Sequence, residues 1–88
     1  MELYISTIVE MPLHWTPEGM MFCDGTILEI SRHPALYSLI GTYYGGDGVK
    51  TFALPDLRPV NEYGVKRPWE NNELRKMIVV DGIYPPRP

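Results

Sequence analysis

The stretch YYGGDGVKTFALPDLRP, residues 43–59, decides how the chain folds. Its segment GGDG, residues 45–48, combines three glycines with an aspartate, a composition typical of a tight turn that needs positive φ angles. The apolar run that follows is predicted to be extended. Pro55 ends its pairing, because proline has no backbone N–H to donate to a neighbouring strand.

Upstream of this turn, apolar residues at helical spacing predict one helix near residues 34–44. The residues that form the apolar stripe are Ala35, Leu36, Leu39, Ile40 and Tyr43. Pro34 fits the first turn of a helix, and Ser31 is a candidate cap in front of it. Gly45 and Gly46 are predicted to end the helix in a left-handed conformation.

Three further segments predict strands. Residues 3–9, LYISTIV, are rich in β-branched side chains. Residues 20–30 contain two apolar runs around Asp24 and Gly25, a dipeptide that favours the tight turn of a β-hairpin. Residues 77–80, MIVV, are fully apolar and read as a central strand. The sequence therefore predicts a small α+β fold of short, mostly antiparallel strands, one helix and extensive loops.

Two other segments complete the organisation that we predict, a single domain over residues 1–88. Residues 59–76 are polar and form a connecting loop on the surface, and loops of this length are usually functional or mobile. Residues 83–88 form a proline-rich tail that cannot enter a sheet interior. We expect this tail to be extended and to dock on its own domain or on a neighbour.

Size and composition indicate the kinds of partner. A chain of 88 residues buries a thin core and usually needs a disulfide, a metal or self-association. The single cysteine, Cys23, rules out an intramolecular disulfide, so we expect a homo-oligomer. A net charge of −3 argues against a nucleic-acid polymer as partner. The chain also lacks the 18 or so consecutive apolar residues of a membrane span, so we expect no membrane partner.

Charge is distributed unevenly along the chain. Residues 1–57 carry two basic and seven acidic side chains, a net charge of −5, whereas residues 58–88 carry six basic and four acidic ones, a net charge of +2. Regions of opposite charge can attract each other within one chain or between copies. A solvated surface of mixed charge is the alternative interpretation.

Catalysis is weakly indicated. Cys23 with His14 or His33 and an aspartate could supply a nucleophile, a base and an orienting group. A lone cysteine is more often a small buried apolar residue, and the usual nucleophile motifs are missing. We therefore predict no catalytic residue, no cofactor and no enzyme activity.

The aspartates beside glycine or proline are predicted to shape turns. Asp24, Asp47 and Asp56 could ligate calcium in principle, but the spacing of a calcium loop is missing, so no metal site is predicted. A short carboxylate in such a position usually accepts hydrogen bonds from the backbone of its own turn. The residues assigned to structural turns are Asp24, Gly25, Gly45, Gly46, Asp47, Gly48, Pro55 and Asp56.

Aromatic residues near basic ones form a candidate ligand site. An aromatic ring can stack on a base or sugar while a guanidinium pairs with a phosphate. The candidates for binding a small nucleotide-like ligand are Tyr43, Tyr44, Arg58, Arg67 and Trp69. Packing in the core or in an interface is the alternative role for these aromatic residues.

The segment TPEGMMFCDGTILEISRHPALYSLIGTYYGGDGVKTFALPDLRP resembles the phage tail collar domain, which is also found in microcystin-dependent proteins. The matching motifs are Pro17-Glu18-Gly19, Cys23-Asp24-Gly25, residues 35–48 and residues 51–58. The ending IVVDGIYPPRP is similar to the terminal strand and tail of the family. After PDLR this chain departs from the family pattern, since Pro59 stands where a glycine is usual and a short polar segment replaces a long glycine-rich region.

The resemblance implies a non-enzymatic structural or interaction protein of a phage, with a trimer as the first expectation and other tail proteins as further partners. Because no fibre shaft is recognised in the sequence, we expect a compact, free-standing collar in the virion tail or in the host cytoplasm. The alternative is an accessory, anti-defence protein that binds and sequesters a small phosphorylated host molecule such as a nucleotide signal.

Overall fold

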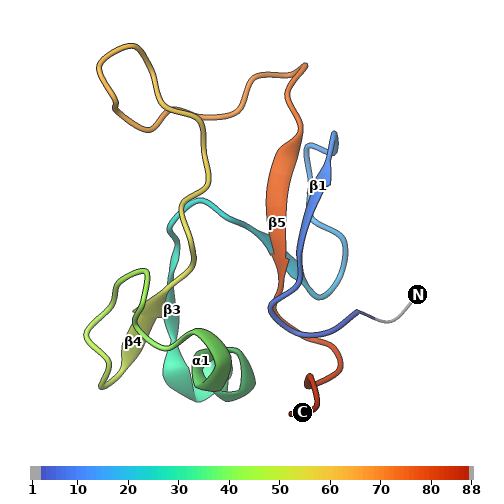
Figure 1. Cartoon of the computed structure of the whole chain (residues 1–88), viewed down its shortest axis with the longest axis vertical. Coiled ribbons are helices and arrows are strands. Elements are labelled where there is room, and N and C mark those ends of the chain that lie inside the picture. Colours follow the sequence, from blue (N-terminus) through green and yellow to red (C-terminus); the bar gives the residue numbers. More distant parts are fainter. Residues whose placement is uncertain (1–2, 88) are drawn as a thin grey trace.

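The computed structural model describes residues 3–87 and shows an α+β fold with two small sheets (Figure 1). Its elements are β1 (Ile8–Met11), β2 (Met20–Phe22), β3 (Ile27–Glu29), the 3₁₀ helix η1 (Ile30–Arg32), α1 (Pro34–Ile40), β4 (Thr51–Ala53) and β5 (Arg75–Val79). All three pairs of strands are antiparallel. The predicted fold class is therefore confirmed.

Strand β5 is the centre of the three-stranded sheet, whose order is β1-β5-β2. Ile78 lies opposite Ile8 on one side and Met21 on the other. The prediction of a central strand here is confirmed, although the strand covers residues 75–79. The strand predicted at residues 3–9 has wrong bounds, since Ser6 has a φ of 78°, which a β-strand does not accommodate.

The hairpin predicted at residues 20–30 is wrong. Strand β2 pairs with β5, and β3 pairs with β4 in the second sheet. Asp24 and Gly25 carry the chain from one sheet to the other, and Asp24 forms an isolated bridge with Asp56. Each half of the predicted hairpin thus pairs with a strand from a distant part of the sequence.

Helix α1 is shorter than predicted and ends at Ile40 instead of residue 44. Gly41 stops it with φ 54° and ψ −145°, and its N–H donates to the Tyr37 carbonyl at 2.7 Å. The stop predicted at Gly45 and Gly46 is therefore wrong. Ser31 does not cap the helix either, because it lies in η1 and His33 occupies the N-cap position.

One hydrophobic cluster joins the two sheets and the helix. Its buried members are Ile5, Cys23, Leu28, Leu36, Phe52, Leu54 and Ile78. Side chains alternate along a strand, so Arg75, Met77 and Val79 lie on the face of β5 opposite to Ile78. These three residues are buried as well, so β5 is covered on both faces.

The connecting segment, residues 59–74, stands away from the core in Figure 1. It ends at Leu74, since Arg75 belongs to β5, so the boundary predicted at residue 76 is wrong. The Asn61 Oδ1 atom orders its turn by accepting hydrogen bonds from the N–H groups of Tyr63 and Val65 at 2.8 and 3.0 Å. The radius of gyration, 13.5 Å, exceeds the value of about 12 Å typical of a compact chain of this length.

The tail docks on its own domain. Ile83 accepts a hydrogen bond from the Ile5 N–H at 2.8 Å and donates to the Leu3 carbonyl at 3.1 Å, and the Tyr84 hydroxyl lies 2.7 Å from that of Ser38. Pro88 of the predicted tail and residues 1–2 lie outside the described residues. No helix within residues 3–87 has the length and apolar character needed to cross a membrane.

Candidate functional site

The five residues predicted to bind a ligand do not form one site. Tyr43 and Tyr44 follow α1 and contact each other edge to face, with ring centroids 5.1 Å apart. The Tyr43 side chain is 87% exposed. Neither tyrosine lines the pocket that holds Arg58 and Trp69. The structure thus separates the tyrosine pair from the basic residues with which we grouped it.

Arg58 and Trp69 come together in a pocket of about 270 Å³. The pocket is lined by His14, Phe22, Asp24, Arg58, Pro68, Trp69 and Arg75. The rings of Trp69 and Phe22 are tilted at 42° to each other, with centroids 6.0 Å apart. Arg67 does not line this pocket. We refer to this site as the Arg75 pocket.

The guanidinium of Arg58 already has a partner. It donates to both oxygens of Asp56, from Nε at 2.9 Å and from Nη2 at 2.8 Å. This pairing raises the pKa of Arg58 and lowers the pKa of Asp56. The Lys66 ammonium donates to the carbonyl oxygens of both residues, at 2.8 and 3.0 Å, and so fixes the start of the connecting segment.

Arg67 forms a second two-pronged ion pair, with Glu73, at 2.7 and 3.0 Å. Glu73 also accepts a hydrogen bond from the Glu70 N–H at 2.8 Å. The hydrogen bonds from Arg67 and from this backbone group lower the pKa of Glu73 to about 2. This ion pair therefore connects Arg67 to a residue that lies two positions before the start of β5.

Arg75 is the residue of this pocket that the sequence analysis missed. Only 8% of its surface is exposed, and its Nη2 atom lies 3.5 Å from the His14 Nδ1 atom. Its Nη1 atom is closed off from solvent and has no hydrogen-bond partner among the described residues. The alternation of side chains along β5 could have identified it, because Arg75 lies on the same face of the strand as the buried residues Met77 and Val79. We had assigned it to the polar loop.

Asp47 organises the turn between α1 and β4. Its Oδ1 atom accepts hydrogen bonds from the N–H groups of Val49, Lys50 and Thr51, at 2.8, 2.9 and 3.0 Å. These three bonds hold the pKa of Asp47 down at about 2. The carboxylate thus replaces the backbone acceptors that a tight turn cannot supply.

The glycines of this turn allow it to approach β4. The φ angles of Gly45, Gly46 and Gly48 are 132°, 94° and 75°. The Gly45 carbonyl accepts a hydrogen bond from the Ala53 N–H at 3.0 Å, so the turn pairs directly with the end of β4. Pro55, two residues beyond β4, is fully buried.

Asp24 and Gly25 form the crossing between the sheets. The Asp24 carboxylate accepts hydrogen bonds from the backbone N–H and the hydroxyl of Thr26. Gly25 has a φ of 81°, and an added Cβ would lie 3.4 Å from the Asp56 side chain. The crossing therefore packs tightly against the segment that follows β4.

Cys23 does not have the properties of a catalytic thiol. Its side chain is fully buried, and burial together with the charge of Asp24 raises its pKa to about 11. A nucleophilic cysteine instead has a lowered pKa and partial exposure. Within residues 3–87, no three or more His, Cys, Asp and Glu side chains are grouped so that they could hold a metal ion.

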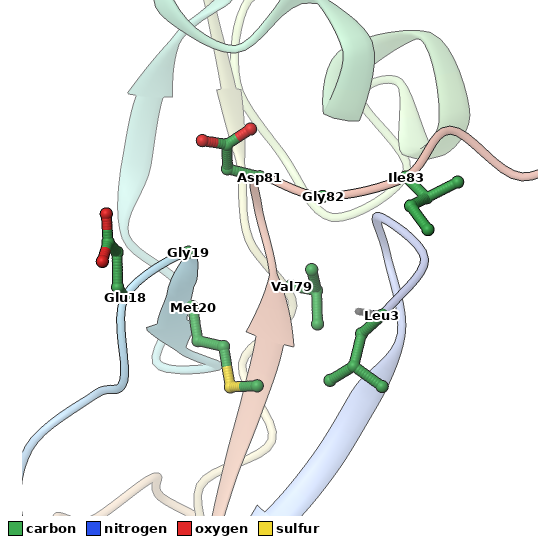
Figure 2. A pocket seen from close by; sticks show the side chains of 8 residues that line it. All are labelled: Leu3, Glu18, Gly19, Met20, Val79, Asp81, Gly82 and Ile83. Atoms are coloured by element: carbon green, nitrogen blue, oxygen red, sulfur yellow. The ribbon is translucent and has the colours of Figure 1, made fainter. Parts of the chain in front are cut away.

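A second pocket, of about 390 Å³, lies where the two chain ends meet β5 (Figure 2). Its lining consists of Leu3, Glu18, Gly19, Met20, Val79, Asp81, Gly82 and Ile83. Figure 2 shows Met20 and Val79 side by side and the carboxylates of Glu18 and Asp81 directed away from them. The lining thus combines apolar side chains with two carboxylates.

A comparison with protein-family models matches residues 6–60 to the phage tail collar domain. This match covers more than half of the 88-residue chain, so the chain belongs to the phage tail collar domain family. It is a phage tail structural protein, which implies a place in the virion tail and agrees with a non-enzymatic role. Searches of curated proteins and of solved structures find no match.

Proposed function

We propose that this chain is a homo-oligomeric tail collar protein that acts through contacts with copies of itself and with other tail proteins. Membership of the collar family is the observation that carries this proposal. We expect a trimer first, as the resemblance implies. The uneven charge of the two parts of the sequence would favour such contacts electrostatically.

The connecting segment is the surface that we assign to self-association. It stands away from the core and exposes three apolar side chains, Val60 at 52%, Tyr63 at 81% and Val65 at 58%. Contiguous exposed apolar residues commonly mark protein interfaces. A second copy seated on this segment would bury them and would add to the small core of each subunit.

Native mass spectrometry and light scattering of the full chain test this proposal. We expect an oligomer, and we expect the triple substitution Val60→Thr, Tyr63→Ser and Val65→Thr to weaken it at least tenfold. Tyr43→Ser is the matched control, since Tyr43 is equally exposed but lies outside the segment. A chain that is monomeric at every concentration contradicts the proposal, as does a triple variant that associates like the wild type.

A second candidate function is the sequestration of a small phosphorylated host molecule. The observation that favours it is the pocket shared by Arg58 and Trp69 with a further arginine. The two functions differ in location and in bound ligand. A tail component is detected by mass spectrometry in purified virions, whereas a sequestering protein is absent from virions and retains a small molecule when purified from infected cells.

A further inference from the structure

Arg75 is a buried cation with no carboxylate in direct contact among residues 3–87, although its charge helps to lower the pKa of Glu73. It is 92% buried and forms no ion pair with any described carboxylate. Its closest polar contact is the His14 Nδ1 atom, at 3.5 Å, which is at the limit of a hydrogen bond. A buried guanidinium with unused donors is unfavourable unless something else pairs with it.

Two other charged groups, Arg58 and Asp24, line the pocket. The Arg58 guanidinium is paired with Asp56, and the Asp24 carboxylate accepts from Thr26. Neither group supplies the missing partner of Arg75. The remaining walls are formed by His14, Phe22, Pro68 and Trp69. The pocket therefore combines an unpaired guanidinium with an aromatic surface.

We propose that the Arg75 pocket binds an oxyanion, a phosphate or carboxylate group, through the guanidinium of Arg75 and with an attached flat ring against Trp69. A guanidinium matches the geometry of such an anion with two parallel N–H donors. The volume of about 270 Å³ admits a phosphate with a small ring. Because the Nη1 atom is closed off from solvent, an anion can reach it only after the side chains around it rearrange.

The biological meaning of this site rests on the second candidate function, but the site does not need self-association. The same chemistry has two possible sources, a free phosphate ester or an acidic side chain from a second copy of the chain. If the anion is a carboxylate from another copy, the pocket is occupied only in the oligomer. A free anion binds to the monomer and to the oligomer alike. Asp24 lines the pocket and opposes both by repulsion.

Nuclear magnetic resonance titrations of the full chain test the site at constant ionic strength, with inorganic phosphate, phenyl phosphate and acetate as probes. The signals to follow are the Arg75 Nε–H and the Trp69 indole N–H. We expect saturable shifts with phosphate, and phenyl phosphate to bind about three to ten times more tightly because its ring adds an aromatic contact. Acetate reports whether a carboxylate suffices.

The variants are chosen to move affinity in opposite directions. Arg75→Met is expected to weaken phenyl phosphate binding at least tenfold while keeping or raising Tm, because it removes an unpaired buried charge. Asp24→Asn keeps the acceptor for Thr26, removes the repulsion and is expected to strengthen binding severalfold. Arg32→Met is the matched control and is expected to change nothing, since the Arg32 side chain is 78% exposed and pairs with Glu29.

The site is wrong if no probe gives saturable shifts, or if Arg75→Met binds as the wild type does. Should Arg75→Met fail to fold, Asp24→Asn and Arg75→Lys decide, since lysine keeps the charge but loses the forked geometry and should bind more weakly. Different outcomes contradict the anion site and the proposed functions. An oligomer that ignores phosphate contradicts only the site, and phosphate binding without any molecule retained from infected cells contradicts only sequestration.

Discussion

At Gly46 the turn after α1 runs so close to β4 that an added Cβ atom would lie 2.3 Å from the Phe52 Cα. Phe52 is fully buried, so the strand cannot move aside without disturbing the core. Gly64 offers a matched comparison, because its φ of 78° is also positive but an added Cβ would meet no atom within 4 Å.

We expect Gly46→Ala to lower the free energy of unfolding by about 3 kcal/mol or more, since it adds a clash to the strain of a positive φ angle. Gly64→Ala carries the strain alone and should cost about 1 kcal/mol. Urea unfolding followed by circular dichroism measures both. Equal losses for the two variants would show that the approach to Phe52 is unimportant.

The roles of some single residues could be predicted from the sequence, and those of others could not. The GGDG turn was predictable from its composition, but the reason for Gly46 was not, because Phe52 approaches it through tertiary packing. Arg75 was misplaced for a related reason, since a charged residue beside a polar segment looks like loop until the strand register is known. Of the five residues predicted to bind a ligand, Arg58 and Trp69 line one pocket, whereas the two tyrosines and Arg67 do not line it.

Leu36 is the most deeply buried of the side chains that attach helix α1 to the core. It is the single buried residue of the helix and is fully inaccessible to solvent, whereas Leu39 is only partly buried against the same cluster. We expect Leu36→Ala to destabilise the protein by about 2–5 kcal/mol. Leu39→Ala, the matched control, should cost about 1–2 kcal/mol. Thermal and urea unfolding compare them, and a smaller loss for Leu36→Ala would contradict this packing.

Elements were predictable where the pattern was strong and local. The central strand at residues 75–79 was recognised from its apolar run, and the start of α1 from Pro34. The end of the helix was missed because Gly41, within an apolar stripe, was overlooked as a stop. The hairpin was predicted wrongly at residues 20–30 because Asp24 and Gly25 favour a tight turn. The sequence around this turn does not show that both flanking strands pair with distant strands instead.

For the molecule as a whole, carboxylates with lowered pKa values contribute to stability in acid. Asp47 and Glu73 each have a folded-state pKa of about 2, below their ordinary values of 3.8 and 4.5. Both are deprotonated more readily in the folded chain, so their contribution is fully present above pH 4.5 and is lost as the pH falls toward 2. The connecting segment and the turn before β4 should loosen together in this range.

We therefore expect Tm to fall as the pH is lowered from about 4.5 to about 2, and the fall to be smaller in Asp47→Asn and Glu73→Gln. At pH 7 both variants should melt several degrees below the wild type. Differential scanning calorimetry across this range is the measurement. Glu62→Gln, an exposed change in the connecting segment, should follow the wild-type curve, and identical curves for all variants would refute the assignment.

The inaccessible thiol of Cys23 makes the protein convenient for site-specific conjugation. Burial raises the pKa of this thiol to about 11, so little thiolate is present at neutral pH, and the sulfur is shielded from reagents as well. A cysteine introduced at Glu62, an exposed position of the connecting segment, would therefore react alone with a maleimide fluorophore, without any change to the native cysteine. Energy transfer between labelled copies would then report directly whether two connecting segments meet.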